Sequence, residues 1–187
     1  MIHWNIAALV GVPGVGKTSL CISAAGVLGC RYVNYGDLML DVAKSRDLAT
    51  NRDEMFNLSI EVQECLWKTA AITIKDTQVS SSKILVDLHG VDRSNIGYII
   101  SLPIGIISPD IIIVVESSYE NIIQRRESDE FRERVLENLE SIDEYMNILR
   151  MSMVAYSVIY GSHLTLLEND DFEKCLNELI KVLSESY

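Results

Sequence analysis

The stretch from Gly11 to Thr18 constrains this chain more than any other feature. It reads Gly-Val-Pro-Gly-Val-Gly-Lys-Thr and fits the pattern G-x-x-x-x-G-K-[ST] at every fixed position. The three glycines leave out the Cβ atoms that would block a tight loop, so backbone N–H groups can converge on a polyphosphate. Lys17 adds a positive charge for the outer phosphates, and the hydroxyl of Thr18 can bind Mg²⁺. The sequence therefore predicts a phosphate-binding loop.

The residues on either side of the loop support this interpretation. Residues 4–10 form a short apolar run that is typical of a buried strand, and residues 19–28 carry apolar side chains at helical spacing. In a strand–loop–helix arrangement the helix N-terminus faces the phosphate with its unpaired N–H groups and the positive end of its dipole.

Composition excludes several classes of protein. With 187 residues, 48% hydrophobic and 23% charged, the chain is expected to form one ordinary globular domain. A net charge of −11 argues against a main role in binding the nucleic acid backbone, because that affinity comes from lysine and arginine. Residues 98–115 are very apolar, but two prolines interrupt them, so we expect no membrane span. We expect no signal peptide at the N-terminus.

The four cysteines are expected to be reduced core residues of a cytoplasmic protein, because none forms a Cys-x-x-Cys pair. They are Cys21, Cys30, Cys65 and Cys175.

Four further segments have the length and apolar content of strands, and helical patterns separate them. The expected strands are 31–35, 83–87, 110–116 and 163–167. The expected helices are 36–48, 51–74, one that begins at about 119, 139–160 and 170–183. The helix 139–160 carries an apolar stripe, beginning at Leu139, that is expected to pack in the core. Asp37 is expected to cap the first of these helices, and residues 90–105 are expected to be irregular. Since all connections look too long for hairpins, the sequence predicts an α/β fold of P-loop NTPase type: a three-layer sandwich with a central five-stranded parallel sheet.

The ligand cleft of such a fold lies at the carboxyl ends of the strands, where we expect the glycine loop, Asp37, Asp87 and Glu116. Asp87 ends a buried strand and is a candidate for holding Mg²⁺, directly or through water. An ordinary solvent-facing strand end is the alternative for this carboxylate.

The size of the chain and its motifs favour a small-molecule kinase. The Asn/Thr-Lys-x-Asp element of GTPases is missing from the sequence, and large ATPases need a longer chain. Phosphoryl transfer requires cations around the migrating group and exclusion of water. The helical insertion at 36–74 is expected to bind the acceptor, and residues 126–136 are expected to form a short lid. Four arginines lie between 125 and 134, although such a mixed-charge stretch can also be a solvated helix face.

Several further motifs, in order along nearly the whole chain, resemble the archaeal type of adenylate kinase, a P-loop nucleoside monophosphate kinase. The motifs are the glycine loop, Val33–Met39, Asn51–Met55, Val86–His89, Gly97-Tyr98, Leu102-Pro103, Pro109-Asp110, Arg125-Arg126 with Asp129, Arg132 and Arg134, and Ala155-Tyr156 with Gly161. The resemblance implies a cytoplasmic homotrimer that converts ATP and AMP reversibly into two ADP with Mg²⁺.

Site residues follow from the resemblance position by position. It implies that ATP is held by Gly11, Val12, Pro13, Gly14, Val15, Gly16, Lys17, Thr18 and Ser19. The acceptor would be held by Asp37, Arg52 and Arg93, and the metal by Thr18 and Asp87. Lys17, Arg125, Arg126, Arg132 and Arg134 would surround the migrating phosphoryl group as catalytic residues. With Arg150, eight basic residues are then expected to converge on one cleft.

Departures from the family pattern keep two alternatives open. Phe56 stands where a second acceptor-side arginine is usual, Ser101 stands for a glycine and Val135 for an acid; further departures are Leu88, Ser94–Ile96 and Tyr145-Met146. Most lie on the acceptor or lid side. One alternative is a kinase for another nucleoside monophosphate or a small alcohol. The other is a non-catalytic nucleotide-binding sensor or assembly protein.

Overall fold

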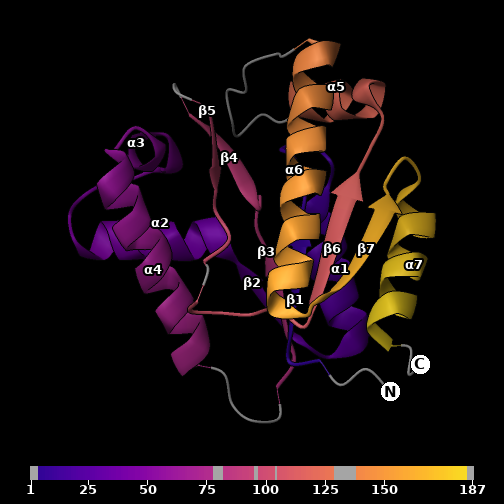
Figure 1. The fold of residues 1–187 in the computed structure, drawn as a ribbon, viewed down its shortest axis with the longest axis horizontal. Coiled ribbons are helices and arrows are strands. Elements are labelled where there is room, and N and C mark those ends of the chain that lie inside the picture. The colour runs from indigo at the N-terminus through magenta and orange to yellow at the C-terminus, as the bar shows by residue number, and fades with distance from the viewer. Residues whose placement is uncertain (1–3, 78–81, 95–96, 104, 129–137, 185–187) are drawn as a thin grey trace.

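A parallel sheet forms the centre of the molecule (Figure 1). The computed structural model describes residues 4–77, 82–94, 97–103, 105–128 and 138–184. Within these ranges the sheet has five strands in the order β2-β3-β1-β6-β7, and every neighbouring pair is parallel. The strands are β1 (Ile6–Val10), β2 (Arg31–Asn34), β3 (Ile84–Asp87), β6 (Ile111–Glu116) and β7 (His163–Glu168). The predicted P-loop α/β fold is confirmed.

The strand register brings the candidate residues to one edge of the sheet. Asp87 at the end of β3 pairs with Leu9 of β1 on one side and with Asn34 of β2 on the other. Glu116 ends β6. All residues of β1 and β3 are buried, so both strands are covered on both faces and only their ends reach the site.

Helices cover the two faces of the sheet. Helices α1 (Lys17–Leu28) and α7 (Phe172–Ser184) pack against each other on one face. Helix α6 (Leu139–Tyr160) covers the other face, in front of the sheet in Figure 1, and α5 (Tyr119–Glu127) follows the end of β6. The indole of Trp4 donates to the carbonyl of Leu183 at 2.9 Å, which joins the first described residues to the last helix.

Three helices lie between β2 and β3, beside the β2 edge of the sheet in Figure 1, and two of them replace the single helix expected over 51–74. They are α2 (Tyr35–Ser45), α3 (Arg52–Phe56) and α4 (Ile60–Asp76). The expectation that Asp37 caps the first helix is wrong. Asn34 is the cap, because α2 begins at Tyr35 and the Asn34 side chain accepts a hydrogen bond from the backbone N–H of Asp37 at 3.1 Å.

Strands β4 (Val91–Ser94) and β5 (Gly97–Ile100) pair as an antiparallel hairpin. The expectations of an irregular segment and of no hairpin connection are therefore wrong here. A side chain of helix α6 holds the hairpin in place: the hydroxyl of Tyr145 donates to the carbonyl of Val91 at 2.7 Å. Such a contact joins residues far apart in the chain, so the local sequence pattern gave no sign of it.

Two expectations about burial are correct only in part. All four cysteines are free, but only Cys21 and Cys175 are buried, whereas Cys30 is half-buried and Cys65 is exposed. In the α6 stripe, Leu139 is exposed and the residues from Ile142 to Tyr156 form the core contacts. None of the helices within the described ranges has the length and apolar character needed to span a membrane.

Candidate active site

The glycine loop joins β1 to α1, and its conformation admits only glycine at key positions. Gly14 and Gly16 have φ angles of +98° and +89°, a region that side chains disfavour. At Gly11 a Cβ atom would lie 2.6 Å from the backbone oxygen of Val115. The loop therefore has the tight curvature that lets its N–H groups converge on phosphate.

The loop holds the ammonium group of Lys17. This lysine is the first residue of α1 and is only 6% exposed, and its ammonium group donates to the carbonyls of Gly11 at 2.7 Å and Val12 at 3.2 Å. The neighbouring side chains of Thr18 and Ser19 are exposed at the helix N-terminus. An anion at this position meets the helix N-terminus, the loop N–H groups and a lysine together.

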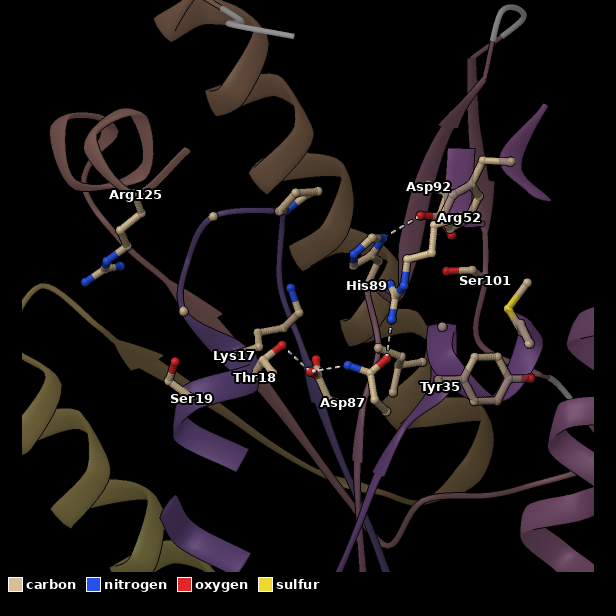
Figure 2. A pocket seen from close by; sticks show the side chains of 18 of the residues that line it. Lys17, Thr18, Ser19, Tyr35, Arg52, Asp87, His89, Asp92, Ser101 and Arg125 are labelled. Carbon is tan, nitrogen blue, oxygen red and sulfur yellow. Dashed lines mark hydrogen bonds and ion pairs between the residues drawn. The ribbon is translucent and has the colours of Figure 1, made fainter. Parts of the chain in front are cut away.

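Asp87 and Thr18, the two candidate metal ligands, are in direct contact. Thr18 Oγ1 donates to Asp87 Oδ2 at 2.6 Å, and the same oxygen accepts from Asn34 Nδ2 at 3.2 Å (Figure 2). The Tyr32 hydroxyl also donates to this oxygen, at 3.4 Å. Burial raises the pKa of Tyr32 to about 12, so this hydroxyl keeps its proton and donates. Asp87 is only 4% exposed, so it is not the solvent-facing strand end that was the alternative, and its contact with Thr18 places it beside the loop.

This pair suits Mg²⁺ that arrives with phosphates. In the described part of the chain, no group of three or more His, Cys, Asp or Glu side chains could hold a metal ion alone. One hydroxyl and one carboxylate are hard oxygen ligands, and Mg²⁺ commonly takes one or two protein ligands and completes its shell with phosphates and water. The donor set fits a nucleotide-bound Mg²⁺.

Two arginines of α5 hold the loop from the β6–β7 side. Arg125 donates to the carbonyl of Val15 at 3.2 Å, Ser117 Oγ at 3.1 Å and the carbonyl of Asn169 at 2.6 Å. Arg126 is 5% exposed and donates to the carbonyl of Pro13 from Nε at 3.0 Å and from Nη2 at 2.9 Å. Arg125 lines the cavity, whereas Arg126 supports the loop from outside the cavity wall.

A cavity of about 370 Å³ extends from the loop to the helical insertion, a size suited to a small-molecule ligand. Arg52 of α3 lines it and donates to Asn34 Oδ1 at 2.9 Å and to Asp37 Oδ1 at 2.6 Å. Figure 2 shows Arg52 and Arg125 on opposite sides of Lys17. The cavity therefore has cations at both ends, from elements far apart in the chain.

The part of the cavity wall near Arg52 combines apolar and polar side chains. The apolar members are Met39, Phe56, Trp67 and Leu88. The polar members His89 and Asp92 are in contact, with Nδ1 and Oδ1 2.8 Å apart, and Ser101 lies on the same wall. A flat, partly polar molecule with an anionic group matches this surface.

Known proteins with similar sequences identify the family. A family model described as an AAA domain matches residues 10–143. A protein named adenylate kinase homolog from Methanothermobacter thermautotrophicus is 42% identical over 96% of this chain and 93% of its own length. Proteins named adenylate kinase from the same organism and from Methanocaldococcus jannaschii are 32% and 35% identical over 96% of this chain and 99% and 98% of their own lengths.

The chain belongs to the adenylate kinase family. The resemblance noted from the sequence motifs is thereby confirmed. Solved structures support the fold: shikimate kinases from Bacteroides thetaiotaomicron and Acinetobacter baumannii superpose with TM-scores of 0.60 and 0.61. They cover 98% and 96% of this chain and 100% and 92% of their own, at only 12% and 14% identity, so the likeness concerns the fold alone.

Only some of the basic residues that were expected to converge on one cleft line the cavity. Lys17, Arg52 and Arg125 line the cavity. Arg93 instead donates to Ser141 Oγ of α6 at 2.7 Å and to the hydroxyl of Tyr98 on the neighbouring strand β5 at 2.8 Å. Arg150 binds both carboxylate oxygens of Glu116. Arg132 and Arg134, with most of the predicted lid, lie outside the described residues.

Four contributing residues escaped the sequence prediction. Asn34 links Asp87 to Arg52, and Asp92 holds His89. Asn169 donates from Nδ2 to the carbonyl of Val15 at 2.7 Å, and Ser117 accepts from Arg125. Asn34, Ser117 and Asn169 end or directly follow parallel strands, so their position at the carboxyl edge was the available signal.

Proposed function

We propose that this chain is an adenylate kinase that transfers a phosphoryl group from ATP to AMP reversibly and gives two ADP. The observation that carries the proposal is one cavity lined by Lys17 and Thr18 on the loop side and by Arg52 on the insertion side. A phosphoryl group passing between these sides stays close to cations throughout, which is the main requirement of such a transfer. Relatives named adenylate kinase support adenine nucleotides as the ligands.

The donor nucleotide would bind along residues 11–19. The loop N–H groups would hold the phosphates, and the ammonium group of Lys17 would exchange its loop carbonyls for phosphate oxygens. Arg125, together with Arg132 and Arg134 from the lid, would neutralise charge that develops on the migrating group. Arg126 would act on the same group by holding the loop through Pro13.

Mg²⁺ is the cofactor that we propose, bound together with ATP. Thr18 and Asp87 would hold it, Asp87 directly or through water, because their oxygens lie together beside the phosphate loop. When bound, the ion supplies positive charge to the outer phosphates of the donor. Asn34 and Tyr32 keep the carboxylate of Asp87 in place by donating to it.

The acceptor would place its phosphate toward Arg52 and its base against the apolar wall. Asp37 would act through Arg52, since its carboxylate fixes the guanidinium at 2.6 Å. Arg93 would contribute to the acceptor side by holding the hairpin against α6. Arginine suits the phosphate end because its planar fork can bind two oxygens at once.

Self-association as a homotrimer is also part of the proposal. Exposed apolar side chains occupy successive turns of α6, namely Met151, Val154, Val158 and Ile159, and Leu166 is exposed on the edge strand β7. Such a group marks a contact surface more often than a solvated one. Light scattering should give three times the chain mass, and Val158→Glu should reduce it. The free cysteines suit the reducing cytoplasm, where we place the enzyme.

A coupled assay of ADP formation tests the activity. We expect turnover with ATP, Mg²⁺ and AMP, and much weaker turnover when CMP, UMP, GMP or a small alcohol replaces AMP. Efficient turnover with one of those acceptors and not with AMP would establish the alternative kinase. Calorimetric ATP binding without turnover on any acceptor would establish a nucleotide sensor instead.

A further inference from the structure

Asp92 is a carboxylate in the acceptor half of the cavity that the scheme above does not use. It belongs to β4, and its side chain is 20% exposed. Its Oδ1 lies 2.8 Å from His89 Nδ1, and Figure 2 shows both side chains on the same wall as Ser101. The hairpin thus carries an acidic group into the space where an acceptor nucleotide would lie.

The contact with His89 orients this carboxylate. Burial disfavours the charged form of Asp92, but the hydrogen bond from His89, with weaker effects of neighbouring donors and of Lys17, outweighs burial, and the pKa of Asp92 is lowered. An ionised carboxylate only accepts hydrogen bonds, so the proton of this contact is on Nδ1 of His89. A carboxylate offers about four lone-pair positions, so one donor leaves capacity for another.

Charge on the cavity wall decides which part of the acceptor faces Asp92. Among the residues that the structure describes, the other charged groups of the wall are Lys17, Arg52, Arg125 and Asp87. A phosphate would be repelled by Asp92 and attracted to Arg52 and Lys17. The uncharged nucleoside part of the acceptor therefore faces Asp92, and a group that meets a carboxylate there must donate a hydrogen bond.

We propose that Asp92, held by His89, recognises a hydrogen-bond donor on the acceptor nucleoside: the exocyclic amino group of its base or a ribose hydroxyl. This inference rests on the proposed function. An acceptor that presents a carbonyl oxygen, or nothing, at that place leaves a desolvated carboxylate unpaired and is rejected. Asp92 is then a specificity-determining residue. The loop N–H groups and the arginines cannot take this role, because they donate hydrogen bonds and do not accept them.

The test compares three acceptors at a fixed ATP concentration. IMP replaces the amino group of AMP by a carbonyl, and 2′-deoxy-AMP lacks one ribose hydroxyl. In the wild type we expect kcat/KM to favour AMP over at least one of them. Asp92→Asn keeps the shape of the side chain but removes its charge. In this variant the kcat/KM for AMP, divided by the kcat/KM for that analogue, should fall at least about tenfold, because a hydrogen bond to a charged group is lost. A change in the AMP/IMP ratio assigns the base amino group, and a change in the AMP/2′-deoxy-AMP ratio assigns the hydroxyl.

Controls separate recognition from damage to the fold. Asp41→Asn, at an exposed position of α2, should leave both ratios unchanged. Thermal denaturation precedes the kinetics, and His89→Gln, which withdraws the donor at Nδ1, is a second variant with the same expected loss of discrimination. The KM for ATP should stay at the wild-type value in both variants.

The inference is overturned if Asp92→Asn keeps both ratios within twofold of the wild type, or weakens all acceptors and ATP equally. Absence of wild-type turnover with AMP would instead refute the proposed function. The inference is then decided by calorimetric binding of AMP, IMP and 2′-deoxy-AMP to the wild type and to Asp92→Asn.

Discussion

Replacing Lys17 by methionine removes one charge from the loop and keeps an unbranched side chain of similar length. In the wild type the ammonium group is buried at 6% exposure and is held by the carbonyls of Gly11 and Val12. Loss of one preorganised contact to transition-state charge costs about 3 kcal/mol, which corresponds to a fall in kcat of about 150-fold. Folding stability should change less, because removing a desolvated ammonium group offsets the two lost hydrogen bonds.

The assay is coupled ADP formation at saturating ATP and AMP, with thermal denaturation measured alongside. Lys68→Met is the matched control, since Lys68 is exposed and its ion pair among the described residues is with Glu64 on the same helix, at 3.3 Å. Such a surface pair contributes about 0.5 kcal/mol, so the control should turn over normally. A Lys17→Met variant that keeps more than about a tenth of the wild-type kcat would refute the role assigned to this lysine.

Three further variants test other parts of the site and fold. Gly11→Ala places a Cβ atom 2.6 Å from the carbonyl oxygen of Val115, so calorimetry should detect no ATP binding. In its control, Gly26→Ala, the Cβ atom meets no atom within 4 Å, and helix stability should rise by about 1 kcal/mol. Arg52→Lys should raise the KM for AMP about tenfold and leave the KM for ATP unchanged in initial-rate kinetics, because lysine lacks the planar fork. Hydrogen bonds from Ser118, Asn121 and Ser117 lower the pKa of Asp170, so its stabilising effect is present above the unfolded pKa of about 4 and is lost as the pH falls through the folded value. Asp170→Asn should therefore unfold at lower urea than the wild type at pH 7, with a difference that shrinks below pH 4.

The donor half of the site could be predicted because local rules specify it. The glycine loop needs its residue types within eight positions, and its flanking strand and helix follow from apolar patterns of different period. Asp87 was predictable for the same reason, since a carboxylate that ends a buried strand must lie at the edge of the sheet.

The acceptor half depends on contacts between distant segments, and prediction was weaker there. Residues 91–100 have little apolar alternation, and the hairpin packs through the Tyr145 hydroxyl and through Arg93, which contacts α6 some 48 residues away. Asn34 was missed as a helix cap because Asp37, three residues on, is an equally good capping residue type. Residue type alone could not choose between them.

Partners decide which cations of this acidic protein are available to a ligand. Arg150 lies at the same edge as the loop, but its guanidinium binds both oxygens of Glu116, so each charge largely cancels the other. Arg52 shares its charge with Asp37. The described partners of Arg125 are instead neutral oxygens of the backbone and of Ser117, which orient the guanidinium without reducing its charge. Arg125 should therefore contribute more to anion binding than Arg150, although both are arginines at the carboxyl edge of the sheet, because neutral partners orient a cation and leave its charge for the ligand.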